Sequence, residues 1–297
     1  MSGLVDASHE EQTSAESDVK SRRALESRSI NSTRVRRLLV RATTSVCHRL
    51  GRQHGGITFV INKICIKQGS LRHLAEASAM QFIAHNTSVP VPKVYCAFER
   101  MGCTYIVMEK IAGDMLAQGC VAQRSEESKT RILLQLKRMI DEIRELPRPD
   151  DKIAVSNVDG GPIWDCRMPN SILHGPFDDT EAFHQYLRNG HAKAPSGWPE
   201  LEELVQLHAR PWSKPVFTHG DLSSLNILVR GDDVVGIIDW ETSGWYPPYW
   251  EYTTACNVNP RNYFWSDEID KFLEPMPTEL HMEQIREKYY GDIPDIR

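Results

Sequence analysis

Residues 215–240 of the chain read PVFTHGDLSSLNILVRGDDVVGIIDW, the densest pattern in the sequence. A short apolar strand ends at the triplet His-Gly-Asp of 219–221, and a second apolar strand follows Asn226. The residues Gly-Asp-Asp at 231–233 reverse the chain, and a third apolar strand occupies 234–238. The pattern predicts an antiparallel hairpin whose polar residues gather at its open end.

The register of this hairpin brings three oxygen-bearing side chains together. A hairpin centred at Asp232-Asp233 sets Asn226 opposite Asp239. Asp221 lies on the loop that leads into the same end. Two carboxylates and one amide oxygen are therefore expected within reach of one another. Mg²⁺ prefers hard oxygen ligands and shares the rest of its shell with phosphates and water, so the sequence predicts a magnesium site here.

Each of these residues taken singly has an ordinary explanation. An Asp at a strand end is most often a turn or cap residue, and a lone His is most often structural. The set His219, Gly220, Asp221 and Asn226 at fixed spacing is expected by chance in roughly a few chains per thousand. The combination therefore indicates a functional site, in which His219 is interpreted as a scaffold for the loop.

The chain ahead of this site predicts a small sheet with one helix. Residues 57–68 form a β-hairpin, and two further strands, 94–98 and 105–108, pair with each other. Between these pairs lies a helix with Ser70 as its expected N-cap. Its apolar stripe consists of Leu71, Leu74, Ala75 and Phe82.

After Gly113 the sequence becomes mainly helical. Residues 126–146 place apolar side chains on one face of a long helix, and 183–187 and 201–207 indicate two more. Strands followed by helices indicate an α+β protein with two lobes, which meet near 109–114.

The predicted domain organisation has three parts. Residues 1–34 are rich in Ser and Glu and poor in aromatics, so they are expected to be a disordered tail. Residues 35–110 are expected to form the N-terminal, nucleotide-binding lobe. Residues 111–297 are expected to form the larger C-terminal lobe, which carries the catalytic site and the substrate site.

Composition favours a cytoplasmic protein with reduced thiols. The seven cysteines are odd in number, scattered and without a Cys-x-x-Cys pair. No secretory pattern or apolar run of ~18 residues is present in the sequence, so no integral membrane segment is expected. The net charge of −5 gives no reason to expect nucleic acid as a partner. The eight Lys or Arg between Lys20 and Arg41 form a basic stretch of a kind that can dock on a membrane or on nucleic acid. They are expected instead to be solvated residues at the entrance of a helix.

The spacing of the central motif resembles that of kinase catalytic loops. His219-Gly220-Asp221 with Asn226 follows H-x-D-x-x-x-x-N, with Gly in place of the usual Arg. Together with Asp239-Trp240-Glu241 it resembles the aminoglycoside phosphotransferase family, which includes choline and ethanolamine kinase relatives. The resemblance implies a two-lobed, protein-kinase-like fold. It implies that Asp221 orients an acceptor hydroxyl and accepts its proton, and that Asn226 and Asp239 hold Mg²⁺ against the phosphates of ATP.

The resemblance extends over roughly residues 45–290. Ile64-Cys65-Ile66-Lys67 resembles the V-A-I-K strand, which implies that Lys67 contacts the phosphates and that Glu76 is its ion-pair partner. The linker between the lobes would bind the adenine edge. Its residues in this sequence are Met108, Glu109 and Ile111. Neither a strict G-x-G-x-x-G loop nor an A-P-E segment is present in the sequence, which argues against a regulated protein kinase.

The sequence therefore predicts an ATP- and magnesium-dependent phosphotransferase that acts on a hydroxyl group of a small molecule. An amino sugar, an amino alcohol or a related metabolite is the expected acceptor. Acids near the C-terminus could face such a cation, but acids there are more often an ordinary solvated face. The acids are Glu241, Glu251, Asp267, Glu268, Asp270 and Glu274. The aromatics of the same region, which are equally compatible with a core, are Trp245, Tyr246, Tyr249, Trp250 and Tyr252.

Two other interpretations stay open at this point. One is a pseudokinase or nucleotide-binding interaction module, which the presence of Lys67 and Asp221 disfavours. The other is a metal-dependent hydrolase that would use His219, Asp221 and Asp239. The oligomeric state is left open.

Overall fold

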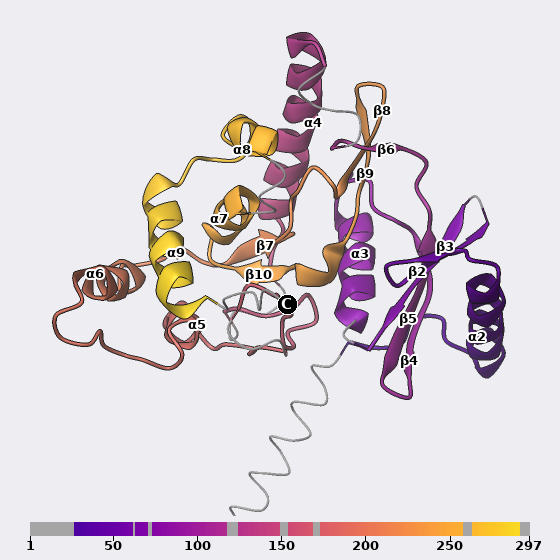
Figure 1. The fold of residues 1–297 in the computed structure, drawn as a ribbon, viewed down its shortest axis with the longest axis horizontal. Helices are drawn as coiled ribbons and strands as arrows, with labels where there is room; N and C mark the ends of the chain where they lie inside the picture. Colours follow the sequence, from indigo (N-terminus) through magenta and orange to yellow (C-terminus); the bar gives the residue numbers. More distant parts are fainter. Residues whose placement is uncertain are drawn as a thin grey trace, which may run out of the picture.

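The computed structural model describes residues 27–61, 63–70, 73–117, 124–148, 154–168, 173–257 and 263–291. Two lobes lie side by side, with strands β1 to β5 in one and most helices in the other (Figure 1). Within the described ranges, no helix combines the length and the apolar character needed to cross a membrane.

The N-terminal lobe is built on one antiparallel sheet of five strands in the order β1-β2-β3-β5-β4. The strands are β1 (Gln53–His54), β2 (Ile57–Ile61), β3 (Ile64–Gly69), β4 (Val94–Arg100) and β5 (Cys103–Glu109). Both predicted strand pairs are present, β2 with β3 and β4 with β5. Met101 and Gly102, at φ 54° and 69°, form the left-handed turn that joins β4 to β5.

Two helices cover the two faces of this sheet. Helix α3 (Leu74–Asn86) lies between the sheet and the C-terminal lobe, and α2 (Arg34–Arg49) lies on the outer side (Figure 1). Side chains alternate accordingly along β4, since Ala97 joins the core that contains α3 while the Phe98 ring lies 5.7 Å from the Arg37 guanidinium of α2.

The predicted start of α3 was wrong. The helix begins at Leu74, with His73 in the N-cap position, and not after Ser70. Strand β3 stays paired with β5 as far as Gly69, which leaves Ser70 no room to begin a helix. Leu71, expected in the apolar stripe, lies outside the described residues.

The expectation of a disordered tail over 1–34 was wrong for its last part. Ile30 and Ala97 exchange backbone hydrogen bonds of 2.8 and 2.9 Å. Thr33 caps α2 by accepting a hydrogen bond from the backbone N–H of Arg36. Strand β4 is an edge strand whose free backbone groups need partners, and the segment around Ile30 supplies them. Residues 1–26 lie outside the described residues.

The C-terminal lobe combines two small sheets with helices. Its helices are α4 (Glu126–Arg144), α5 (Thr180–Leu187), α6 (Pro199–His208), α7 (Trp250–Asn257), α8 (Tyr263–Ile269) and α9 (Pro277–Tyr290). One sheet pairs β10 (Gly244–Tyr246) with β7 (Val216–Thr218); the other has the order β6-β8-β9, formed by Asp114–Met115, Ile227–Arg230 and Asp233–Ile237. The predicted helices over 126–146, 183–187 and 201–207 are all present as α4, α5 and α6.

The lobes share one hydrophobic core, which α3 enters from the N-terminal side. The Phe82 ring of α3 lies 5.4 Å from that of Phe217 and 6.2 Å from that of Trp245. The segment after α3 is also attached to the large lobe, because Ser88 donates two hydrogen bonds of 2.7 Å to the Glu142 carboxylate of α4. The Pro90 carbonyl accepts a bond of 2.8 Å from the N–H of Ile237 in β9.

Candidate active site

The loop between β7 and β8 carries the predicted catalytic residues. Gly220 has φ +81°, and a Cβ at this position would lie 2.9 Å from the Thr242 carbonyl oxygen. The Thr242 hydroxyl in turn donates to the His219 carbonyl at 3.0 Å. Both the backbone conformation and the close approach of Thr242 therefore require glycine between His219 and Asp221.

His219 is buried, and both of its ring nitrogens are engaged. Nε2 lies 3.0 Å from the Ile238 carbonyl, to which it donates, and Nδ1 accepts from the Asp221 N–H at 3.2 Å. Burial lowers the pKa of His219, which keeps the ring neutral. The geometry fits the scaffold interpretation, and it argues against the hydrolase alternative because no ring nitrogen is left to bind a metal.

Asp221 and Asn226 are joined directly. The side-chain amide of Asn226 donates to the carbonyl of Asp221 at 2.9 Å and to its carboxylate Oδ2 at 2.8 Å. These bonds use the amide nitrogen of Asn226, so the amide oxygen is the atom available to a cation. Burial raises the pKa of Asp221 above its ordinary value, an effect that the neighbouring Arg167 opposes.

Asp239 reaches the same end of the hairpin one residue later than expected. The Asn226 carbonyl accepts from the Ile238 N–H at 2.9 Å, so Asn226 lies opposite Ile238 and not opposite Asp239. The difference arises because the two-residue turn is Gly231-Asp232, between the paired Arg230 and Asp233, and not Asp232-Asp233. A register shift between Leu228 and Val229 recovers one of the two positions. Asp239 itself has φ 66° and ψ 60°, a left-handed conformation that turns the chain into the short 3-10 helix η2 (Trp240–Thr242).

Lys67 connects the two lobes at this point. Its side chain is only 4% exposed, and Nζ lies 2.8 Å from Glu76 Oε1 and 2.5 Å from Asp239 Oδ1. Glu241 Oε2 lies 2.8 Å from the same nitrogen. The structure thus brings together Lys67, Glu76 and Asp239, which the sequence analysis selected on different grounds. Glu241, considered for the acceptor, instead lies on η2 beside Lys67.

The donor atoms around Lys67 fit a hard cation. One carboxylate oxygen each of Glu76, Asp239 and Glu241 lie within 4.8 Å of one another. The Asp239 side chain is 36% exposed, so its carboxylate can also be reached from the cleft. These three carboxylate oxygens are donors of the kind that Mg²⁺ prefers.

Glu251 binds the backbone of the loop between β7 and β8. Its carboxylate accepts from the backbone N–H of His219 at 2.7 Å and from that of Gly220 at 2.9 Å. The residue is 1% exposed at the start of α7, so it lies neither on a solvated face nor at a surface that an acceptor could reach. The sequence feature that could have indicated this role is the position of Glu251 among aromatic residues that form core. A carboxylate buried there needs hydrogen-bond donors, and the backbone N–H groups of the loop supply them.

Arg167 holds the same loop from the other side, and sequence reasoning did not select it. The guanidinium makes two bonds of 2.7 Å to the Asp165 carboxylate and donates to the Gly220 carbonyl. Arg286 of α9 donates to the Arg167 carbonyl at 3.3 Å. Opposite charges on Glu251 and Arg167 therefore fix the N–H and the carbonyl of Gly220.

The aromatic residues near the C-terminus form core, not an exposed stacking surface. Tyr246, Tyr249 and Trp250 are at most 1% exposed. The rings of Tyr246 and Trp250 stack at 5.5 Å with an interplanar angle of 3°. The nearby Trp265 of α8 donates its indole N–H to the Leu222 carbonyl at 2.9 Å, which supports the catalytic loop.

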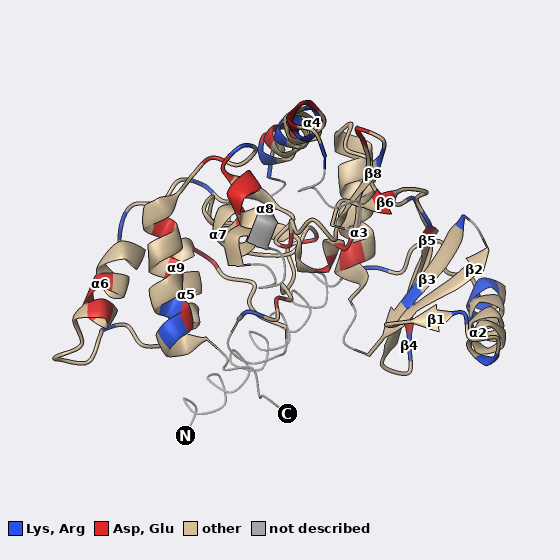
Figure 2. Ribbon diagram, turned by 45° about the horizontal axis from the view of Figure 1, so that its top comes forward, with Lys and Arg blue, Asp and Glu red and all other residues tan. Residues whose placement is uncertain are grey.

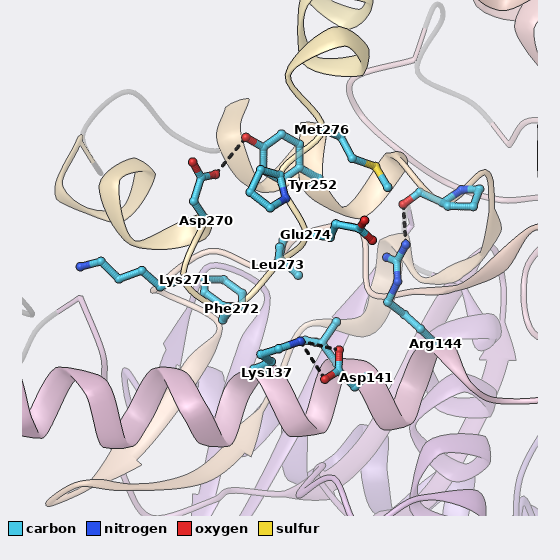
Figure 3. Close-up of a pocket in the computed structure, with 13 residues that line it drawn as sticks. Lys137, Asp141, Arg144, Tyr252, Asp270, Lys271, Phe272, Leu273, Glu274 and Met276 are labelled. Carbon is cyan, nitrogen blue, oxygen red and sulfur yellow. Dashed lines mark hydrogen bonds and ion pairs between the residues drawn. The ribbon is translucent and has the colours of Figure 1, made fainter. Parts of the chain in front are cut away.

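Two cavities lie outside the residues described so far. One, of about 360 Å³, lies between the lobes and is lined by His73 to Ala75, at the start of α3, and by Asn157 and Pro162. The other, of about 390 Å³, lies between α4, the start of α7 and segment 270–276 (Figure 3). Figure 3 shows Lys137 and Asp141 bonded to each other on α4, and Tyr252 bonded to Asp270. Tyr252, Asp270 and Glu274, which were considered for the acceptor from the sequence, line this second cavity, whereas none of the residues predicted for catalysis, nucleotide or metal does.

The chain is similar to known phosphotransferases in sequence pattern and in fold. A family profile described as "Phosphotransferase enzyme family" matches residues 66–280. A thermostable mutant of the aminoglycoside phosphotransferase APH(4)-Ia in its apo form is similar at a TM-score of 0.55 and 15% identity, over 79% of this chain and 78% of that chain. A ternary complex of that enzyme with ADP and hygromycin B also gives a TM-score of 0.55, at 14% identity, over 82% and 87%.

A further similar structure is the GDP and kanamycin complex of APH(2")-IIia, with a TM-score of 0.52, 14% identity and coverage of 78% and 80%. No curated protein sequence matches the chain. The structural similarity confirms the predicted two-lobed, protein-kinase-like α+β fold.

Proposed function

This chain belongs to the phosphotransferase enzyme family, and we propose on that basis that it transfers the γ-phosphate of ATP to a hydroxyl group of a small molecule. Family membership makes it a kinase with an alcohol group as acceptor. The observation that supports the nucleotide assignment is the meeting of Lys67 from the small lobe with Asp239 from the large one.

Asp221 is proposed to align the acceptor hydroxyl and to accept its proton. Its carboxylate is oriented by the amide of Asn226, and its loop is fixed by Glu251 and Arg167. Phosphoryl transfer has a loose transition state, so positioning and charge neutralisation supply most of the rate enhancement. A rigidly held Asp221 fits that requirement.

Lys67 is proposed to bind the phosphates, with Glu76 holding its ammonium group in place. Asn226 and Asp239 are the residues that would hold Mg²⁺. Asp239 belongs to a cluster of carboxylate oxygens, and the hydrogen bonds of Asn226 to Asp221 use its amide nitrogen and leave its oxygen for a cation. When bound, the ion neutralises charge on the phosphate oxygens.

The linker after β5 is proposed to bind the adenine edge through its backbone. The N–H of Glu109 donates to the Lys93 carbonyl and that of Lys110 to the Lys63 carbonyl, both at 2.9 Å. These bonds commit two donors of the linker to the lobe itself. Of the predicted set Met108, Glu109 and Ile111, the Ile111 N–H and the Glu109 carbonyl are therefore the proposed contacts.

The acceptor is proposed to be an amino sugar or an amino alcohol. Support comes from the structural similarity to kinases that bind hygromycin B and kanamycin. Two acids considered for such a cation, Glu241 and Glu251, have other roles in the structure, and Asp270 accepts from the Tyr252 hydroxyl. Of the six acids considered from the sequence, these three therefore already have partners within the protein.

The test is transfer of labelled γ-phosphate from ATP and Mg²⁺ into a pool of amino sugars, amino alcohols and other small metabolites. Label in a small-molecule product, lost in Asp221→Ala and retained in Asp233→Ala, is the expected result. Asp233 is a suitable control because it is an exposed Asp at the far turn of the same hairpin. Nucleotide binding without label in any acceptor would instead favour a pseudokinase.

A further inference from the structure

The outward face of α2 carries an apolar stripe. Large aliphatic side chains on this helix and at its C-cap are more than half exposed: Val35 at 66%, Leu38 at 59%, Leu39 at 62%, Val46 at 54% and Leu50 at 64%. Their spacing of three or four residues, with Ala42 between them, places them on one side of the helix. A helix of 16 residues extends this stripe over about 24 Å.

The stripe is not the face that packs on the sheet. The buried residues of α2 are Thr44 and Cys47, and Arg37 extends over Phe98 from the same inner side. In Figure 1, α2 lies at the outer edge of the N-terminal lobe, on the side away from α3 and from the C-terminal lobe. The apolar side chains therefore face solvent in the described structure.

The surroundings of the stripe are strongly basic. The sequence has no Asp or Glu between Glu26 and Glu76, although the whole chain has a net charge of −5. Arg34, Arg41 and Arg49 recur every seven or eight residues along one border of the stripe, and Arg36 lies at the other. Figure 2 shows basic and no acidic residues on α2.

Two occupants of this apolar face are disfavoured: a second copy of the chain by its charge, and the N-terminal segment by its length. A second copy of the chain would bring two arginine-rich helices together with no acid between them, and like charges at close range repel. The acidic N-terminal segment 1–18 has its large apolar residues only in its first five positions. Five residues span at most roughly 18 Å, less than the length of the stripe.

We propose that α2 lies in the surface of an anionic lipid bilayer. The aliphatic stripe would enter the boundary between headgroups and acyl chains, while Arg34, Arg36 and Arg49 bind lipid phosphates. A basic helix with a large aliphatic face is the composition that this binding mode requires. Because α2 and α3 cover opposite faces of the sheet, the cleft with Lys67 and Asp221 stays open to solvent in this orientation. The proposal is independent of phosphoryl transfer.

The test is cosedimentation of the full chain with vesicles of phosphatidylcholine alone and with vesicles that also contain phosphatidylserine. Binding to the anionic vesicles is expected to exceed binding to the neutral ones by at least about tenfold, and to weaken with salt. The double variant Leu38→Asp/Leu39→Asp is expected to lose this binding, and Arg34→Glu/Arg49→Glu to lose its preference for anionic lipid.

The matched control is Leu134→Asp, a change at a leucine that is 49% exposed on α4 of the other lobe. It is expected to bind the vesicles like the unchanged chain. Circular dichroism melts separate loss of binding from loss of folding, since α2 substitutions at solvent-facing positions should leave the melting temperature unchanged. Equal binding to neutral and anionic vesicles, no binding to either, or a lipid-free dimer abolished by the Leu38/Leu39 variant would each overturn the proposal.

Discussion

Lys67 and Asp239 lie 172 positions apart in the chain and on different lobes, yet their charged groups meet at 2.5 Å. Glu76 and Glu241 contact the same ammonium group at 2.8 Å each. The lysine thus compensates three carboxylates that would otherwise repel one another. A metal cation bound to Asp239 would neutralise part of the same negative charge. Metal binding and the position of the Lys67 ammonium group are therefore expected to depend on each other.

Asp221→Ala is expected to reduce phosphate transfer by at least about a thousandfold while nucleotide binding is retained. The reason is that Asp221 is proposed to align the acceptor hydroxyl, whereas the phosphates of the nucleotide are assigned to Lys67. Label transfer and equilibrium binding of a nucleotide analogue measure the two effects separately. Turnover near that of the unchanged chain would contradict the proposed mechanism.

Asp239→Ala is expected to abolish the dependence of nucleotide affinity on Mg²⁺. The change removes one proposed metal ligand and leaves Lys67 with Glu76 and Glu241. Titration of a nucleotide analogue with and without Mg²⁺ measures this dependence. In Asp233→Ala, Mg²⁺ should strengthen binding as it does in the unchanged chain; a magnesium effect that persists in Asp239→Ala would remove Asp239 from the metal site.

Glu251→Ala is expected to lower the free energy of unfolding by roughly 2–5 kcal/mol. The substitution leaves the buried N–H groups of His219 and Gly220 without their acceptor, at about 1–3 kcal/mol each. Urea unfolding measures the change. Glu279→Ala, at an acid of α9, is the comparison and should cost less than about 1 kcal/mol. A loss in Glu251→Ala no larger than in this comparison would mean that the clamp adds nothing to stability.

Stability is expected to fall as the pH decreases below about 6.5 because two neutral histidines are buried together. Burial lowers the pKa of His184 to about 3 and that of His208 well below its usual value. Their rings stack at 4.1 Å, and His184 Nε2 lies 2.9 Å from the Tyr249 hydroxyl. Between pH 6.5 and 3 the unfolded chain binds protons that the native chain does not, which costs up to about 1.4 kcal/mol per pH unit for each histidine.

Urea unfolding at pH 7 and pH 5 measures this dependence. His184→Gln should be less stable than the unchanged chain at pH 7 and should show a shallower decline with pH. His281→Gln, at a histidine whose side chain is 54% exposed, should leave the slope unchanged. Equal slopes in the unchanged chain and in His184→Gln would exclude the buried pair as the cause.

Much of the fold could be predicted from short sequence patterns. The hairpins at β2 to β3 and β8 to β9 follow from alternation and turn residues, and α4 follows from its apolar face. Features that depend on a single contact have no recurring sequence pattern and could not be predicted. The pairing of Ile30 with Ala97 is one isolated bridge. The turn at Gly231-Asp232 and the register shift beside Leu228 together set Ile238 opposite Asn226, and no residue type in the hairpin indicates either feature.

Some residues of the candidate site could likewise be predicted from the sequence, and others could not. Asp221 and Asn226 stand at a fixed spacing, and Lys67 and Glu76 lie nine residues apart, so short motifs were enough to select them. Glu251 and Arg167 act on the loop from 31 and 53 residues away, through contacts with backbone groups. A carbonyl or an N–H is the same at every position, so no sequence pattern records which side chain will bind it.

The attachment of the small lobe at two places limits how it can move. One attachment is the linker between β5 and β6, and the other is the segment after α3, where Ser88 binds Glu142 and Pro90 binds Ile237. These attachments and the packing of Phe82 on Phe217 and Trp245 oppose sliding of the small lobe across the large one, whereas rotation about the attachments is the motion they allow. The separation of Lys67 from Asp239 is the distance that would measure such a rotation.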